Sequence, residues 1–193
     1  MAEVSSTMCA IGLFNIASLT TESEPEFSTR LMTTPLDCDE IHIQGATQFF
    51  IKRQSSPGQN PEWVFQCSKP RSRSFTLTAM TLLGPLPPAW SSSNIEELLA
   101  EVPIPEHPGS IHTTSRAWVL AAVHALISSK ALKLEHDPAL MWACAFREAC
   151  SHVPINYTIP IPVLHETDQM VDLSYIQLLQ ENLRTSFPPV PQQ

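Results

Sequence analysis

Apolar residues recur at helical spacing between residues 113 and 130, and this stretch carries the strongest periodic pattern in the chain. Trp118, Ala122, Ala125 and Leu126 follow the i, i+4, i+7, i+8 spacing that places side chains on one face of a helix. Further apolar residues widen this face until few polar positions remain, which is typical of a helix covered on most sides. We therefore expect a helix over residues 113–130 at the centre of the core.

Alternating apolar and polar residues mark the N-terminal half of the chain. Such alternation places every second side chain on the same face of a sheet. The alternating segments follow one another through short, turn-forming connections, which favours an antiparallel meander. The predicted strands of this meander cover residues 40–54, 62–68 and 74–83, and a further strand that docks on the core is expected within residues 8–19.

Capping and proline signals predict the remaining elements. Ser93 followed by Glu96 resembles a capping box and begins a short helix, and a proline in the first turn begins another. A strictly alternating segment that contains prolines can pair only at a sheet edge, and the last periodic segment is amphipathic, as expected of a terminal helix. In chain order these elements cover residues 94–101, 137–150, 155–164 and 172–187.

One domain accommodates this order of strands and helices, because 193 residues with 43% apolar content suffice for one core. We expect a frayed N-terminus over residues 1–7, a single α+β domain over residues 8–187 and a Pro-rich tail over residues 188–193. Residues 20–39 are rich in Thr, Ser and Glu, and we expect an acidic loop or a disordered segment there. The expected fold is an antiparallel β-meander packed on a central buried helix, with additional C-terminal helices.

Charge and cysteine content narrow the classes of protein. The formal net charge of −8 opposes binding to phosphate backbones, so no nucleic-acid partner is expected. The five cysteines are widely spread and form no CxxC motif, which favours reduced thiols in a cytoplasmic protein. The apolar segment near the N-terminus is too short to span a bilayer and lacks the basic residues of a signal peptide. We therefore expect no membrane association.

Candidate catalytic residues are few. Ser115 near the start of the predicted helix would benefit from the positive field at that end, but it needs a base within hydrogen-bond reach. His112 and His42 are the candidate acids or bases. His107 and His112 flank a Pro-Gly turn, but their spacing is not that of a common zinc motif. We therefore expect neither a metal nor another cofactor.

Aromatic residues are the candidate ligand-binding positions. Trp118 and Phe49 lie in the predicted core elements, where large aromatic side chains are most simply packing anchors. Trp90 follows a Pro-rich break and lines a pocket if the loop leaves it exposed. These three residues would contact a small apolar ligand if the core encloses a pocket.

The strand segment TQFFI (residues 47–51), the two strands after it and the helix start TSRAWV (residues 114–119) follow one another in a characteristic order. Over about residues 40–130 this layout resembles the permuted papain-like families of the NlpC/P60 and lecithin retinol acyltransferase types, and small fungal proteins of the same plan. In those families a histidine on the first strand faces a cysteine at the helix start, where the helix terminus lowers the thiol pKa. Here Ser115 stands at the cysteine position and Thr47 at the histidine position. The resemblance therefore implies a scaffold without thiol chemistry.

Three classes of function remain open. The first is a non-hydrolytic accessory or small-ligand-binding protein, in a biosynthetic pathway such as fungal secondary metabolism, with a small apolar ligand or a protein as partner. The second is a cofactor-free hydrolase, isomerase or cyclase that uses His112, Ser115 or His42 as acid, base or nucleophile. The third is a protein-interaction module that presents Trp90 and the Pro-rich residues 103–108.

Overall fold

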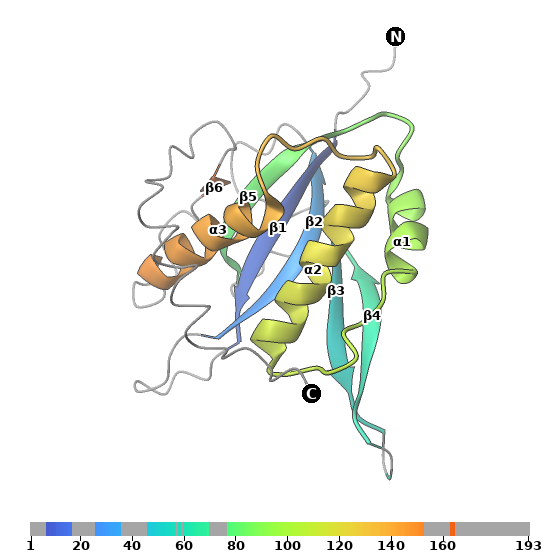
Figure 1. The fold of residues 1–193 in the computed structure, drawn as a ribbon, viewed down its shortest axis with the longest axis vertical. Coiled ribbons are helices and arrows are strands. Elements are labelled where there is room, and N and C mark those ends of the chain that lie inside the picture. Colours follow the sequence, from blue (N-terminus) through green and yellow to red (C-terminus); the bar gives the residue numbers. More distant parts are fainter. Residues whose placement is uncertain are drawn as a thin grey trace, which may run out of the picture.

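A sheet covered on one face by helices forms the described part of the chain, as a computed structural model shows (Figure 1). This confirms the predicted α+β fold. The structure describes residues 7–16, 26–35, 46–56, 58, 60–69, 77–152 and 163–164. The strands are β1 (Thr7–Asn15), β2 (Phe27–Pro35), β3 (Thr47–Gln54), β4 (Glu62–Ser68), β5 (Leu77–Leu86) and β6 (Val163–Leu164). The helices are α1 (Ser92–Ala100), α2 (Ile111–Ser128) and α3 (Pro138–His152).

The strand order in the sheet is β4-β3-β2-β1-β5-β6. Strands β1 to β4 form consecutive antiparallel pairs, so the sheet contains an antiparallel meander, and β3 and β4 pair in it as predicted. The predicted place of its last strand is wrong, because β5 pairs with β1 and not with β4. The chain crosses from β4 to the other side of the sheet, where β1 offers an edge that is apolar on both faces. The short β6 then pairs in parallel with β5.

Strand β2 lies within the segment that was predicted to be a loop, and that prediction is wrong for residues 27–35. Phe27 and Leu31 are fully buried beneath the helices, and so is Thr29 between them. The alternation is hidden in the sequence because Ser and Thr count as polar residues. Threonine is nevertheless β-branched and fits a half-buried pleated surface. Hydroxyl-bearing residues therefore form a central strand here.

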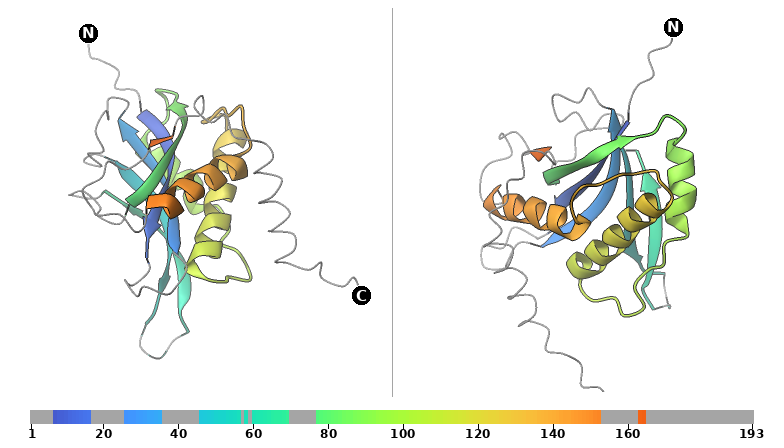
Figure 2. Two further views of the ribbon diagram at one scale, coloured as in Figure 1. Left: turned by 90° about the vertical axis from the view of Figure 1, so that its left-hand side faces the viewer. Right: turned by 45° about the horizontal axis from the view of Figure 1, so that its top comes forward.

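Helix α2 is the central buried helix, as predicted. It begins two residues earlier than the sequence pattern suggests, because the Ser110 side chain caps it by accepting a hydrogen bond from the Thr113 N–H at 3.2 Å. Figure 2 shows α2 and α3 side by side on the same face of the sheet, with α2 against β2 and β3 and α3 against β5 and β1. The buried face of α2 contributes Trp118, Val119, Ala122, Val123 and Leu126 to the main core.

The remaining helix boundaries follow from local capping. Helix α1 uses Ser91 and Asn94 as its capping box, so the predicted use of Ser93 and Glu96 is wrong. Helix α3 begins at Pro138 as predicted, and the Asp137 carboxylate accepts a hydrogen bond from the first turn at 2.7 Å. Residues 155–162 of the predicted edge strand and the predicted terminal helix over residues 172–187 lie outside the described residues.

Candidate functional site

Ser115 lies in the first turns of α2 and is fully buried against β2. Its hydroxyl accepts a hydrogen bond from the Thr29 N–H at 3.0 Å and donates one to the carbonyl oxygen of His112 at 3.3 Å. Both partners are backbone groups, so the hydroxyl joins the helix to the strand. A catalytic serine needs a base at its hydroxyl and an open approach for the substrate. In the described segments no imidazole hydrogen bonds to Ser115, and its side chain has no exposed surface.

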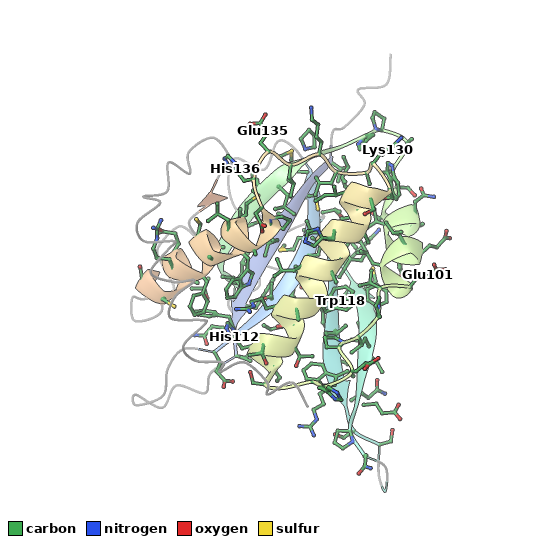
Figure 3. The ribbon with its side chains drawn as sticks, viewed as in Figure 1. Glu101, His112, Trp118, Lys130, Glu135 and His136 are labelled. Atoms are coloured by element: carbon green, nitrogen blue, oxygen red, sulfur yellow. The ribbon has the colours of Figure 1, made fainter. Side chains whose placement is uncertain are left out.

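His112 is half-buried at the start of α2 (Figure 3). Its Nδ1 lies 3.3 Å from the carbonyl oxygen of Phe27, which can only accept, so Nδ1 carries the proton. Burial is the main cause that lowers the pKa of His112, and the Arg116 charge lowers it further. The Phe27 carbonyl and the Glu26 carboxylate raise the pKa without reversing this shift. His112 is therefore a neutral imidazole at pH 7, with its lone pair on Nε2.

An aromatic cluster surrounds His112 and joins α2 to α3. The rings of Trp142 and Phe146 stack with centroids 5.1 Å apart, and the His112 ring lies 5.6 and 5.2 Å from them. The Arg116 guanidinium lies 4.8 Å from the Trp142 ring, within the range of a cation–π contact. The Trp142 indole donates a hydrogen bond to the Thr29 hydroxyl at 3.1 Å. The cluster is thus a packed junction of two helices and a strand.

The predicted ligand-binding aromatic residues belong to the main core. Trp118 and Phe49 are fully buried, and the Trp118 indole donates to the carbonyl oxygen of Val102 at 3.4 Å. Figure 3 shows Trp118 further along α2 than His112. Trp90 is half-buried and packs against the same core. His42 lies outside the described residues.

A second group of polar residues lies on the sheet face opposite the helices. The guanidinium of Arg30 in β2 is 4.1 Å from the ring centroid of Phe14 and 4.5 Å from that of Phe50. Its Nη1 donates a hydrogen bond of 2.7 Å to Oε1 of Gln48 in β3. Gln48 is almost fully buried and Arg30 is half-buried. We call this pair, with the two phenyl rings, the Arg30–Gln48 site.

Two buried donors at the Arg30–Gln48 site have no acceptor. They are Nε of Arg30 and Nε2 of Gln48. The bond from Arg30 requires Oε1 of Gln48 to face it, so Nε2 is the amide atom left over. Burial lowers the pKa of Arg30, but a guanidinium keeps its charge at neutral pH. Within the described segments no carboxylate forms an ion pair with Arg30, so its charge has no anionic counterpart there and two donors lack an acceptor.

Gly12 gives this site its close packing. In the β1–β2 register Gly12 lies opposite Arg30. A Cβ atom at Gly12 would come within 2.6 Å of the Met32 sulfur and 2.9 Å of the Phe14 ring. Any larger residue would therefore push apart the apolar side chains beside the guanidinium. These side chains form a separate buried cluster, which consists of Ala10, Phe14, Met32, Ala46, Leu77 and Met80.

The chain matches none of the protein-family models, curated proteins or solved structures with which it was compared. The resemblance to papain-like families therefore stays a prediction. In the segments that the structure describes, no helix is long and apolar enough to cross a membrane. Nor do three or more His, Cys, Asp or Glu side chains in those segments gather as a metal site would require.

Sequence reasoning missed the Arg30–Gln48 site because Arg30 falls in the segment that was predicted to be a loop. The even spacing of Phe27 and Leu31 was the available signal, since in a strand it places both on one face and Arg30 on the opposite face. Gln48 belongs to the TQFFI segment, in which only Thr47 and Phe49 were considered as site positions. The Arg30 guanidinium, together with the free Nε and the free Gln48 Nε2, could bind a negatively charged acceptor group such as a carboxylate.

Proposed function

We propose that this protein is a non-hydrolytic accessory protein that binds a small organic acid, with the acid's carboxylate at the Arg30–Gln48 site. The observation that supports this proposal is the half-buried guanidinium whose Nε, together with the Gln48 Nε2, has no acceptor. A buried donor without an acceptor costs about 1–3 kcal/mol. A ligand that supplies acceptor oxygens would recover this free energy, which the ligand-free protein loses.

The chemistry of the site favours a carboxylate with an apolar body. The two oxygens of a carboxylate can accept two parallel hydrogen bonds from the edge of a planar guanidinium. One negative charge balances one guanidinium, whereas a doubly charged phosphate would leave an unpaired charge in apolar surroundings. The half-buried Phe50 ring, 4.5 Å from the guanidinium, suits a hydrocarbon or aromatic group on the acid.

The surroundings of Ser115 support the non-hydrolytic part of the proposal. Its hydroxyl is committed to two backbone hydrogen bonds, and the His112 ring is bonded to the carbonyl oxygen of Phe27 instead of to the serine. A hydrolase that used this pair would have to break the connection between α2 and β2. Binding without covalent chemistry needs no such rearrangement.

Isothermal titration calorimetry with benzoate and benzamide tests the proposal. The two molecules have nearly the same size, but only benzoate carries the charged acceptor, so benzoate should bind and benzamide should not. Arg30→Gln should abolish benzoate binding. Arg53→Gln removes the same charge from an exposed position of β3 and should leave binding unchanged.

Two results would contradict the proposal. Equal binding of benzoate and benzamide would show that charge plays no part. Equal loss of binding in Arg30→Gln and Arg53→Gln would show that benzoate responds to the net charge of the protein and not to the site. Far-UV circular dichroism of each variant verifies that the fold is retained.

A further inference from the structure

Strand β4 ends the sheet on one side (Figure 1). It pairs with β3 over its whole length, from Ser68 opposite Gln48 to Glu62 opposite Gln54, without any shift of register. In the described part of the chain no strand pairs with its other side. The outer backbone N–H and C=O groups of β4 therefore form a regular row at the sheet edge.

The two edges of the sheet differ in how readily they could pair with a strand of another chain. The β5 side is irregular, with register shifts against β1, Pro85 in the strand, and β6 paired to it. Such features keep a sheet edge from pairing with another chain. The seven residues of β4 include no proline, lysine or arginine, and Glu62 at the end is its charged residue. Within the described residues, β4 thus has neither the proline, the basic residue nor the bulge that commonly protects an edge strand.

We propose that β4 pairs antiparallel with β4 of a second copy of this chain, about a two-fold axis at Phe65. Phe65 is the middle residue of the strand, so this register engages all seven residues of each copy. Trp63 then lies opposite Cys67 of the second copy, and Val64 lies opposite Gln66. The two Glu62 carboxylates lie at opposite ends of the joint ribbon, each across from a Ser68 hydroxyl.

Side-chain chemistry supports this register over shifted ones. Directly opposite residues in an antiparallel pair share a face, and pairs of aromatic or apolar residues stabilise the sheet whereas like charges destabilise it. The full register places apolar residues across from apolar residues on the helix-bearing face, where Trp63, Phe65 and Cys67 are half-buried. Every shift that keeps the faces matched leaves at least two residues of each strand unpaired. Such a shift also either brings the two glutamates closer together or leaves them beyond the paired residues.

The inference is independent of the proposed organic acid. Arg30 belongs to β2, the third strand from this edge, so a ligand there requires no second copy. Conversely, pairing at β4 requires no ligand. Failure of one proposal therefore leaves the other in place.

Light scattering coupled to size-exclusion chromatography tests the pairing through two double variants. The wild type should show twice the chain mass of 21.4 kDa at high concentration. Val64→Lys with Gln66→Lys places like charges opposite each other twice and should reduce the mass to that of one chain. Val64→Lys with Gln66→Glu places opposite charges there and should restore the dimer. Ala117→Lys with Ala139→Lys makes the same charge change on exposed helix positions and should leave the dimer intact.

A disulfide variant tests the same register without added charge. Val64→Cys with Gln66→Cys brings two thiols across the strand pair, so mild oxidation should yield covalent dimers on a non-reducing gel. Val64→Cys alone leaves the two new thiols further apart than the roughly 7 Å between Cα atoms that a disulfide tolerates, so it should yield far fewer.

Clear outcomes would overturn the inference. A wild type that stays at 21.4 kDa at every concentration would show that the edge does not pair. A dimer that persists in the Lys–Lys variant would place the interface elsewhere. Equal masses for the Lys–Lys and Lys–Glu variants, or equal cross-linking of the two cysteine variants, would exclude the proposed register.

Discussion

Gln48→Glu should make the protein more stable and at the same time prevent benzoate binding. The substitution supplies a carboxylate at the position where Gln48 now accepts a 2.7 Å hydrogen bond from Arg30. It also removes the Gln48 Nε2 donor, which is buried and has no acceptor. An internal carboxylate would then supply the negative charge that we assign to the ligand and would repel a second carboxylate.

The expected gain follows from two contributions and one cost. Removing a buried unsatisfied donor is worth about 1–3 kcal/mol, and a charged acceptor strengthens the bond to Arg30 by roughly 1 kcal/mol. Burying the new carboxylate costs free energy, which pairing with a guanidinium that is already buried offsets in large part. We expect a net gain of about 1–2 kcal/mol in the free energy of unfolding, or roughly 2–8 °C in Tm for a chain of this size.

The pH dependence of this gain has a defined sign. The Arg30 charge should hold the pKa of the introduced carboxyl below its unfolded-state value of about 4.3. The extra stability is then fully present above about pH 4.3 and is lost as the pH falls through the lower folded-state pKa. Chemical denaturation of the wild type and the variant across this range measures the difference directly.

Asn60→Asp is the matched control, because it makes the same change from amide to acid in an exposed turn and should leave stability unchanged. A Gln48→Glu protein that is less stable than the wild type at pH 7 and still binds benzoate would refute the reasoning. Such a result would mean that Arg30 does not lack an anionic partner.

Three further predictions concern the junction of α2, α3 and β2. Ser115→Ala removes the acceptor of the buried Thr29 N–H, so chemical denaturation should show a decrease of about 1–3 kcal/mol in the free energy of unfolding. In the wild type, a fluorophosphonate probe should leave Ser115 unlabelled. Folding lowers the pKa of His112, so the neutral imidazole contributes stability that is fully present above about pH 6.5. This stability is lost as the pH falls from there through the lower folded-state pKa. The His112→Gln variant should therefore show a flatter dependence of unfolding free energy on pH in this range. Trp142→Phe leaves the Thr29 hydroxyl without its donor and weakens the cation–π contact with Arg116. The free energy of unfolding should therefore decrease by about 1–2 kcal/mol, and the Tm should fall by a few degrees. An unchanged Tm would show that these contacts do not stabilise the packing of the two helices.

Periodic patterns predicted the elements that bury large apolar side chains. The repeat around Trp118 is dense enough that α2 could be placed at the centre of the core, and strict alternation marked β4 at its observed bounds. Both signals are local and depend only on residue spacing. The same is true of the start of α3, where a proline fits the first turn of a helix.

Elements that depend on tertiary contacts escaped sequence reasoning. Strand β2 contains Ser28, Thr29, Thr33 and Thr34, which are buried in the folded protein although they are not apolar. Because β2 was not predicted, nothing connected β1 to the pair of β3 and β4. The last predicted strand was therefore placed next to β4, whereas in the structure β5 pairs with β1. Propensity is a weak guide where such tertiary burial decides the conformation.

The polar sites show the same limit. Ser115 was expected near the start of a helix, but the sequence alone could not show that the polar atoms of Ser115 and His112 form hydrogen bonds with the backbone of β2. The Arg30–Gln48 site joins two strands whose pairing was unknown, so its unpaired donors become apparent only in three dimensions.

Proton NMR of the Arg30 Nε–H group tests the central claim most directly. In protein labelled with ¹⁵N-arginine, the Arg30→Gln variant identifies this resonance by its absence. Benzoate should move the Arg30 Hε signal downfield through a new hydrogen bond to a carboxylate, whereas benzamide should leave it in place. An Arg30 Hε signal that stays unchanged at saturating benzoate would contradict the assignment of this site as the place where an organic acid binds.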